Sequence, residues 1–390
     1  MPRCVRIIVL LTSFGWALTP AATSAAPSAP EPIARNLNFP VNMAFAPDGR
    51  LFFAEKDTGD VRVIEDGVVT PTPVVHVDVL SSSEQGLLGL ALDPDLAENG
   101  WMYLYYSDPT SRTNRLIRVR DSGDRPQTQP LLDLLTTEHG YHNGGDLVFG
   151  TDGTLFVAVG EVHEADRAQD PNDLGGKILR LNPDGSIPAD DPFGPEDPVY
   201  SMGHRNSFGL CVDPNGGQLW ETENGPSSDD EVNRIEPGGN YGWPDQLGPG
   251  GEAPFIDPVV DFPQVIVPTG CAVWRGSVYF GAYGTGLVYR IRGADATDAG
   301  AEVVADLGSG VTDLQVGPDG ALYASTTDAI WRLPSAGSPT ATPATTATPA
   351  GGDTAGGSSI RNLITALMLV VVAVALIVRF RAGRALREDR

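Results

Sequence analysis

Basic residues are scarce in this chain of 390 residues. It carries 26 Lys and Arg residues against 50 Asp and Glu residues, which gives a formal net charge of −24 at pH 7. A surface that follows the phosphates of a nucleic acid needs clustered positive charge, so this balance argues against nucleic-acid binding. It favours cations and neutral small molecules as partners.

Cysteine and helix-forming composition are also in short supply. Three cysteines cannot build a disulfide framework, and 46 Gly with 33 Pro argue against long helical bundles. We find no helical crossovers of the kind that a parallel α/β fold needs. The hydrophobic content of 41% is nevertheless enough to fill a large core, so most of the chain is predicted to be globular.

The amino-terminal end has the pattern of an export signal. Arg3 and Arg6 precede the apolar run 7–18, and small residues follow it. This order predicts a cleaved signal peptide over residues 1–26, with an uncleaved anchor as the alternative. Either one exports the body of the protein.

The carboxy-terminal end has the pattern of a membrane anchor. Residues 363–378 are apolar apart from one threonine, and arginines flank them on both sides. This predicts a transmembrane helix over 360–380 and a basic cytoplasmic tail over 381–390, with a buried core helix as the alternative. The Thr-, Pro- and Gly-rich segment 334–359 cannot bury a core and is predicted to be an extended stalk. The expected location is the cell membrane, crossed once, with the body of the protein extracellular.

Two cysteines remain after removal of the signal peptide, which contains Cys4. An oxidising compartment allows Cys211 and Cys271 to pair. Two separate buried thiols are the alternative.

One sequence phrase occurs six times between the two ends. It consists of short apolar alternation, a turn of Asp, Pro or Gly type, and alternation of aromatic or β-branched residues; the copies begin at Met43, Leu90, Leu147, Leu210, Ala272 and Leu314. Each copy is typical of a β-hairpin, and most are followed by a third strand such as Val61-Arg-Val-Ile. Units of about 50 residues predict an all-β fold, a six-bladed β-propeller over residues 34–333. Loops at one end of its central channel are expected to carry the functional site.

Two of these loops contain residues that a turn does not need. Ser83-Glu-Gln-Gly places Gln85, which can both donate and accept hydrogen bonds, before the second inner strand. Tyr141-His-Asn-Gly-Gly-Asp places His142 before glycines that let a ligand approach the backbone. Each side chain also has a purely structural alternative, in which it satisfies neighbouring protein groups.

A third loop begins with Gly203-His-Arg-Asn and continues, after a strand, with Glu223-Asn-Gly-Pro-Ser-Ser-Asp-Asp-Glu. Arg205 is a positive charge in a strongly negative domain, which suits an anionic or developing negative oxygen. The acidic run 229–231, beside the carbonyls of Gly225 and Pro226, offers the hard oxygen ligands that calcium prefers. A solvated acidic turn is the alternative, because the spacing matches no EF-hand loop.

These motifs resemble those of the soluble glucose and aldose sugar dehydrogenases, six-bladed propellers that use pyrroloquinoline quinone (PQQ) and calcium. The resemblance spans residues 36–333 and is most specific in Gly203-His-Arg-Asn, in the motif 223–233 and in Gly238-Gly-Asn-Tyr-Gly-Trp-Pro. It implies a PQQ-dependent enzyme that oxidises a small aldose substrate and passes the electrons to an acceptor.

The resemblance also implies roles for individual residues. His142 would be the general base that takes the proton of the sugar hydroxyl while a hydride passes to the quinone. Gln85, Arg205 and Asn206 would contact the cofactor, and Arg205 would stabilise its reduced oxygen.

Calcium has two implied sites. The carbonyls of Gly225 and Pro226 would hold the ion that polarises the quinone. Glu231 and Tyr241, ten residues apart as in the family, would hold a further, structural calcium.

The sequence departs from the family where the carboxylates of the cofactor bind. The family places a lysine in a loop of the fifth blade and two arginines before the last inner strand. Here Gly284 stands in place of the lysine, and Gly310 and Thr312 stand near the arginine positions. A tricarboxylate without those cations loses several charge-assisted hydrogen bonds.

Two other functions stay open. The missing cations favour a non-catalytic propeller that binds a partner or a glycan, as in the hedgehog-interacting relatives of the family. A calcium-dependent hydrolase of the lactonase type shares the architecture, but it holds its metal with carboxylates on the channel axis, whereas the acidic residues here gather in one loop. The base, the arginine and the calcium loop together favour the sugar dehydrogenase.

Overall fold

The computed structural model describes residues 29–120, 126–136, 138–292 and 300–334. The predicted signal peptide, transmembrane helix and basic tail lie outside these ranges, as does the predicted stalk apart from residue 334. Within the ranges, no helix combines the length and the apolar character that crossing a membrane requires.

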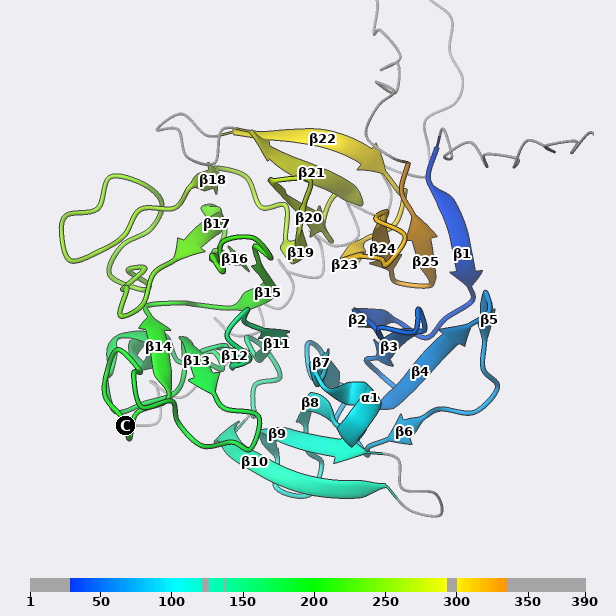
Figure 1. Cartoon of the computed structure of the whole chain (residues 1–390). Helices are drawn as coiled ribbons and strands as arrows, with labels where there is room; N and C mark the ends of the chain where they lie inside the picture. The colour runs from blue at the N-terminus through cyan, green and yellow to red at the C-terminus, as the bar shows by residue number, and fades with distance from the viewer. Residues whose placement is uncertain (1–28, 121–125, 137, 293–299, 335–390) are drawn as a thin grey trace, which may run out of the picture. The chain divides into compact units, whose positions relative to one another are not determined.

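The described strands form six antiparallel sheets, arranged around a central axis as the blades of a propeller (Figure 1). The first blade contains β2 (Pro40–Phe45), β3 (Leu51–Glu55), β4 (Asp60–Glu65), β5 (Val68–Val69) and β6 (Val75–His76). The second contains β7 (Leu87–Leu92), β8 (Met102–Ser107), β9 (Thr113–Arg120) and β10 (Gln127–Thr136), with the short helix α1 (Leu96–Asn99) after β7. The third contains β11 (Gly144–Phe149), β12 (Leu155–Val159), β13 (Lys177–Leu181) and β14 (Val199–Met202), with a 3-10 turn at Ala165–Gln169.

The remaining three blades follow the same plan. The fourth contains β15 (Ser207–Val212), β16 (Leu219–Glu223), β17 (Asp230–Ile235) and β18 (Val260–Phe262). The fifth contains β19 (Pro268–Trp274), β20 (Ser277–Ala282), β21 (Leu287–Arg292) and β22 (Gly300–Asp306). The sixth contains β23 (Val311–Val316), β24 (Leu322–Thr326), β25 (Ala329–Arg332) and β1 (Glu31–Arg35).

The six sequence repeats are the inner hairpins of the six blades. Each inner strand (β2, β7, β11, β15, β19 or β23) pairs antiparallel with the strand that follows it. Successive inner strands contact one another, and β23 contacts β2, so the ring is closed. The prediction of an all-β, six-bladed propeller is therefore confirmed.

The sixth blade is completed by a strand from the start of the chain. β1 pairs antiparallel with β25, with Glu31 opposite Arg332 and Ala34 opposite Ile330. Figure 1 shows β1 on the outer edge of the sixth blade. The propeller thus begins at Glu31, and its last blade combines both ends of the domain.

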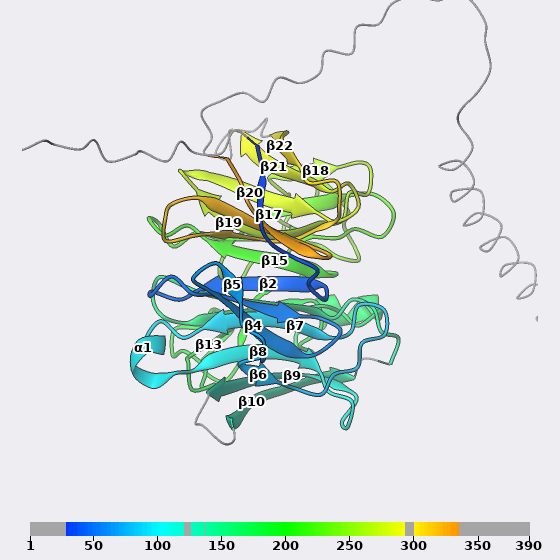
Figure 2. The same ribbon diagram turned by 90° about the vertical axis from the view of Figure 1, so that its right-hand side faces the viewer.

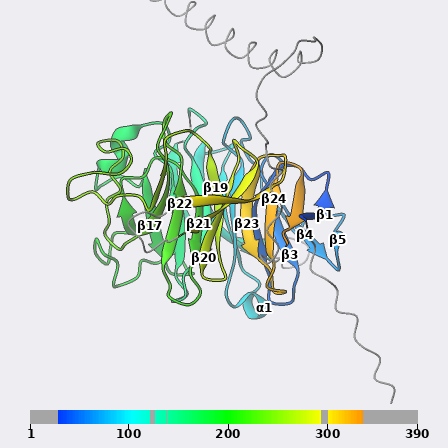
Figure 3. The same cartoon turned by 90° about the horizontal axis from the view of Figure 1, so that it is seen from above.

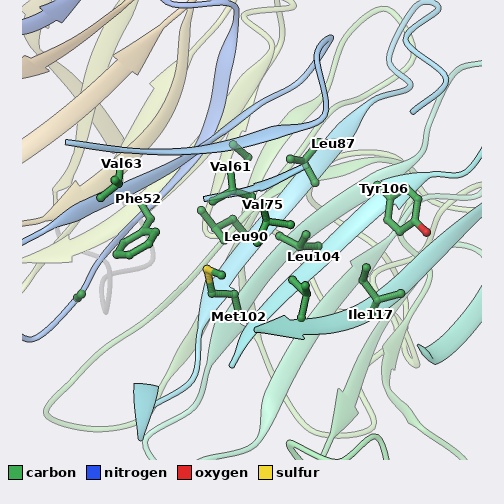
Figure 4. Packing of buried hydrophobic residues seen from close by; sticks show 13 residues of the cluster. Phe52, Val61, Val63, Val75, Leu87, Leu90, Met102, Leu104, Tyr106 and Ile117 are labelled. Carbon is green, nitrogen blue, oxygen red and sulfur yellow. The ribbon is translucent and has the colours of Figure 1, made fainter. Parts of the chain in front are cut away.

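Successive side chains of a strand point to opposite faces, so the second strand of a blade can bury one set of side chains against each neighbouring blade. In β3, Phe52 and Ala54 pack in the cluster shared with the second blade, as Figure 4 shows for Phe52. Leu51 and Phe53, which alternate with them along the strand, pack in the cluster shared with the sixth blade. Burying side chains of this size contributes about 1.5–3 kcal/mol each, so every blade is held by the two neighbours that it faces.

All six inner strands carry a register shift close to their first residue. Such bulges turn a side chain away from the regular pleat and occur near functional sites. The side views in Figures 2 and 3 show the strands running between the two faces of the ring. The bulges therefore mark one face, where the inner strands begin, and α1 lies at the opposite face.

A disulfide joins the fourth and fifth blades. Cys211 on β15 and Cys271 on β19 are bonded, with their Cα atoms 5.6 Å apart. Both residues line a cavity of about 300 Å³ that also contacts the β11–β12 turn, at the face opposite the bulges. Of the two alternatives that the sequence left open, the structure contains the bonded pair.

Candidate functional site

A cavity of about 390 Å³ lies at the face where the inner strands begin. The second residue of five inner strands lines it, and each of these residues sits at the bulge of its strand: Val41, Leu88, Phe208, Thr269 and Thr312. The walls above them are mainly apolar and include Phe39, Val267 and Tyr283. This volume and this lining are typical of a site for a small molecule.

Three polar side chains lie on the inner strands at the bottom of the site. Asn42 donates to Asp146 across the channel (Nδ2 to Oδ1, 2.6 Å) and accepts from the amide of Leu90 (3.1 Å). Asp146 accepts from the amide of Leu210, and Asp313 accepts from the amide of Met43 (2.7 Å). Each of the three therefore connects its blade to the following one.

Burial governs the charge of the two aspartates. It raises the pKa of Asp146 to about 6, and burial together with the charge of Asp146 raises the pKa of Asp313 well above its ordinary value. Acidic residues on the channel axis are thus present, contrary to the expectation that they gather in one loop. Their oxygens accept backbone N–H groups of neighbouring blades, so they connect blades in this structure.

His142 lies two residues before Gly144, which lines the cavity, and it has a left-handed backbone (φ 54°) and only 7% of its surface exposed. Its Nδ1 lies 2.8 Å from Glu161 Oε1, and its Nε2 lies 2.8 Å from Arg205 Nη2. Arginine can only donate, so Nε2 accepts and Nδ1 carries the proton that is donated to Glu161. The geometry therefore specifies a neutral imidazole whose basic lone pair is on Nε2.

Glu161 is held as firmly as the histidine that it orients. Its side chain is buried, and its second oxygen accepts from the amide of Glu164 (2.9 Å). Its own amide donates to the carbonyl of Arg205 (3.0 Å). The carboxylate can therefore fix the tautomer and the ring orientation of His142.

Arg205 connects the histidine to the predicted calcium loop. Its Nη1 donates to the carbonyls of Asn224 (2.8 Å) and Gly225 (3.0 Å), and its backbone amide donates to Glu223. Its guanidinium lies over the ring of Trp243, 5.3 Å from the centroid. Arg205 Nε and Trp243 Nε1 are buried and have no hydrogen-bond partner among the described residues. Two unpartnered donors side by side suit a ligand that carries acceptors.

The other two predicted cofactor residues are less open. Asn206 is buried, and its amide group links the amide of Gly144 (3.2 Å) to Glu84 Oε2 (3.1 Å). Gln85 is also buried, with its Oε1 beside Gly140, while the neighbouring Ser83 and Glu84 line the cavity. Glu84 also accepts from the amide of His142 (2.7 Å), so it joins the loops of Gln85, His142 and Asn206.

A buried cluster of charged groups lies behind Arg205. His204 Nδ1 is 3.0 Å from Glu221 and 3.3 Å from Glu223, and His204 Nε2 bonds Ser201 (2.8 Å). Burial by itself lowers the pKa of His204, but the two glutamates outweigh this and raise it to about 10. His204 is therefore a cation that balances part of the cluster, and Glu223 in turn fixes the backbone of Arg205.

Glu231 belongs to this cluster. Asn233 Nδ2 lies 3.2 Å from both Glu221 and Glu231, and the amide of Gly248 donates to Glu231 (3.1 Å). Burial and the charge of Glu223 raise the pKa of Glu231 to about 8. His204, Glu221 and Glu223 have ligand atoms within 4.8 Å of one another, and the protonated His204 is the cation that these two carboxylates hold in this structure.

The remaining predicted calcium ligands occupy two places. Gly225 presents its carbonyl to Arg205, and Pro226 is exposed beside it. Tyr241 stacks on His204 (centroids 4.9 Å apart), and its hydroxyl donates to the carbonyl of Arg234 (2.6 Å). The hydroxyl is thus occupied, and the main-chain carbonyl is the oxygen that Tyr241 can offer to a metal. Asp230, in the same acidic run, accepts three backbone amides and shapes the loop.

Two of the positions where the family has cations, Gly284 and Gly310, have no room for a side chain here. A Cβ at Gly310 would lie 2.7 Å from the ring and 2.8 Å from the carbonyl of Tyr283, and one at Gly284 would lie 2.7 Å from the carbonyl of Ile266. Thr312 faces the cavity, and its hydroxyl contacts the carbonyl of Pro40 (2.6 Å). The departure noted in the sequence is therefore part of the packing of the fifth and sixth blades.

Sequence reasoning missed Glu84, Glu161 and the role of Glu223. Glu161 follows β12 and is 19 residues from His142, and nothing in a single sequence shows that the two loops meet. A usable signal was the position: each of these residues lies at or next to the end of a strand at the bulged face, as do His142 and Arg205.

Known aldose sugar dehydrogenases are similar to this chain over most of its length. Aldose sugar dehydrogenase YliI of Escherichia coli is 29% identical over 366 residues, which cover 84% of this chain and 95% of that protein. The PQQ-bound aldose sugar dehydrogenase of Streptomyces coelicolor superposes with a TM-score of 0.71 at 31% identity, covering 80% of this chain and 99% of that one. A solved protein of Thermus thermophilus gives a TM-score of 0.73 at 36% identity, covering 78% and 99%. The model of the family described as Glucose / Sorbosone dehydrogenase matches residues 37–333. The chain therefore belongs to the glucose/sorbosone dehydrogenase family.

Proposed function

We propose that this protein is an oxidoreductase that oxidises aldose sugars with PQQ as its cofactor and calcium as its metal. The observation that carries the proposal is the hydrogen-bonded group Glu161–His142–Arg205. It lies next to an apolar cavity, because Glu84, which lines the cavity, accepts from the amide of His142. A held carboxylate, a neutral imidazole and a guanidinium are the parts that removing a proton and stabilising a developing negative charge require.

The residues present fit an anionic, flat cofactor. The walls offer Phe39, Val267 and Tyr283 to a ring system, and the rim offers Lys56. The unpartnered donors of Arg205 and Trp243 suit acceptor oxygens. Arg205 would donate to a quinone oxygen. Gln85 and Asn206, whose loops are connected through Glu84, would contact the cofactor beside Arg205.

When bound, PQQ would supply the two-electron oxidant for the hydride at C1 of the sugar. His142 Nε2 would take the proton of the C1 hydroxyl, and loss of this proton and the hydride would leave a lactone. Glu161 keeps Nδ1 protonated and stabilises the imidazolium that forms. Arg205 Nη2 contacts Nε2 in the structure, so the guanidinium would have to leave this contact before the base can act.

Calcium fits the carbonyl side of Arg205. The oxygens of Gly225 and Pro226 are of the type that calcium binds, and a carbonyl can accept from Arg205 and a cation together. The buried carboxylates around Glu231, with the carbonyl of Tyr241, support a second, structural ion.

The test is a titration of the full-length protein with PQQ and Ca²⁺, followed by aldose-dependent reduction of a dye. We expect saturable binding and sugar-dependent turnover, with His142→Ala binding PQQ but losing about 10²-fold or more in kcat. Absence of PQQ binding well above micromolar concentration would overturn the proposal and leave a propeller that serves as a binding module. Lactone hydrolysis without PQQ would instead indicate the hydrolase.

We also propose that the propeller is attached to the outer face of the cell membrane through residues 360–380. The support is the sequence pattern alone. The expected result is that the full chain sediments with membranes, whereas a chain that ends at Leu333 stays in the supernatant. Equal fractionation of the two chains would contradict the attachment.

A further inference from the structure

We infer that Lys56 binds a carboxylate of the cofactor, supplying from the first blade the cation that the fifth and sixth blades lack. This rests on the proposed function, because it assumes PQQ, a tricarboxylate, in the cavity. Lys56 follows β3 and lines that cavity. The chain has two lysines, and the other, Lys177, is buried with its amine donating to the carbonyls of Arg167, Ala168 and Gly175. Lys56 is thus the lysine that a ligand in the cavity can reach.

The ammonium group of Lys56 is held in place, and the carboxylate that pairs with it, Asp57, is half exposed to solvent. Its residue is 7% exposed, its Nζ lies 2.7 Å from Asp57 Oδ1, and it stands 5.3 Å from the centroid of the Phe39 ring. The Asp57 side chain is 51% exposed, so it can return to solvent at little cost when another carboxylate approaches. An ammonium group that is already desolvated along its stem gains more from a charged acceptor than one in open water.

Lys56 is connected to the rest of the site. A Cβ at Gly86 would lie 2.5 Å from Lys56 Cγ, and the amide of Leu87 donates to the carbonyl of Lys56 (2.9 Å). The stem of the lysine therefore packs on the loop of Glu84 and Gln85. Glu84 in turn accepts from the amide of His142, so one continuous set of contacts runs from Lys56 to the base.

Gly284 of the fifth blade and Gly310 before the sixth cannot supply this charge. Gly284 and Gly310 have no space for a Cβ, and the ring of Tyr283 packs against Gly310. Tyr283 also lies 6.1 Å from Phe39 between ring centroids, and Lys56 stands over Phe39. Lys56 therefore places a positive charge at the end of the apolar wall that Tyr283 and Phe39 form.

The experiment is equilibrium binding of PQQ to the full-length protein in the presence of Ca²⁺, followed by quenching of tryptophan fluorescence. Lys56→Met keeps most of the stem and removes the charge, and we expect it to raise Kd about 10-fold or more and to weaken the salt dependence of binding. Lys56→Arg should restore most of the affinity. Asp57→Asn should bind at least as tightly as the wild type, because it removes the competing carboxylate.

Arg50→Met is the matched control. Arg50 is also paired with an aspartate, Asp48 (2.8 Å), but it lies in the β2–β3 turn at the opposite face, so the variant should bind PQQ as the wild type does. Wild-type affinity in Lys56→Met, or an equal loss in Arg50→Met, would overturn the assignment while leaving the proposed function in place. Failure of the wild type itself to bind PQQ would refute both.

Discussion

The chemistry of the site depends on which nitrogen of His142 carries the proton. Glu161 accepts from Nδ1, and Arg205 donates to Nε2, so the two neighbours together select one tautomer. His142 and Arg205 stand out in the sequence because histidines are few and the charge balance is strongly negative. Glu161 does not stand out, because a glutamate in a chain with 50 acidic residues carries no signal of its own.

Replacing Glu161 with Gln should separate orientation from packing. The amide has nearly the same shape, but it can present an N–H to Nδ1, so the tautomer is no longer fixed. We expect kcat for sugar oxidation to fall about 10²-fold or more, with a smaller change in KM. The exposed neighbour Glu164, which pairs with Arg167, gives the control Glu164→Gln. An unchanged kcat in Glu161→Gln would show that the carboxylate has no part in the reaction.

The pair Asp146–Asp313 should make stability depend on pH. Both pKa values are raised by burial, that of Asp146 to about 6, so between about pH 4 and pH 6 the folded protein binds more protons than the unfolded chain. The stabilisation is complete below about pH 4. The part due to Asp146 is lost as the pH rises through about 6, and the part due to Asp313 is lost as the pH rises through its own raised pKa.

Asp313→Asn tests this dependence. The variant loses one acceptor at every pH, but it does not titrate, so its deficit in the free energy of unfolding should be larger at pH 5 than at pH 7.5. Urea unfolding at the two pH values measures the difference. A deficit that stays constant or grows with pH would mean that the pair is already ionised at pH 5.

Single strands set the shape of the site and close the ring. In five inner strands the bulge turns the second residue toward the channel, which is how Val41, Phe208 and Thr312, from blades far apart in the sequence, come to line one cavity. The repeat phrase predicted the hairpins, because apolar alternation and turn residues are local signals. The bulges were not predicted, since a shift of one residue arises from how neighbouring blades pack. β1 was missed for the same reason: it pairs with β25, nearly 300 residues away, and no local pattern links them.

Removal of β1 should open the ring. A chain that starts at Asn36 lacks the outer strand of the sixth blade and exposes the edge of β25, whereas a chain that starts at Pro30 keeps it. We expect the shorter chain to melt at a lower temperature and to self-associate, because an unpaired strand edge attracts other strands. Equal melting temperatures and equal monomer fractions in size-exclusion chromatography would contradict a closing role for β1.

The six blades behave as one body because each shares a hydrophobic cluster with both neighbours. The disulfide adds a covalent link between the fourth and fifth blades across 60 residues of chain. It lies beside the cavity at the face opposite His142, so it bears on stability and leaves the site untouched.

The double variant Cys211→Ser/Cys271→Ser should lose about 3–4 kcal/mol of stability through the greater entropy of its unfolded chain. Its PQQ affinity should match that of the wild type. Thermal unfolding under non-reducing conditions and the binding titration measure the two quantities. A drop in PQQ affinity without a drop in melting temperature would contradict the separation of the disulfide from the site.

The sequence by itself determined the architecture of this protein and the motifs that its candidate site contains. Six local hairpin signals led to a six-bladed propeller, and the motifs around His142 and Arg205 indicated the family, because these patterns depend on neighbours along the chain. The tertiary structure decided what depends on neighbours in space: the partner of His142, the commitment of Asn206 and Asp230 to backbone groups, the pairing of Cys211 with Cys271, and the place of Lys56 on the cavity. A ring closed by its first strand brings together residues that no local pattern connects, and for that reason the contacts that define the site were visible only in the fold.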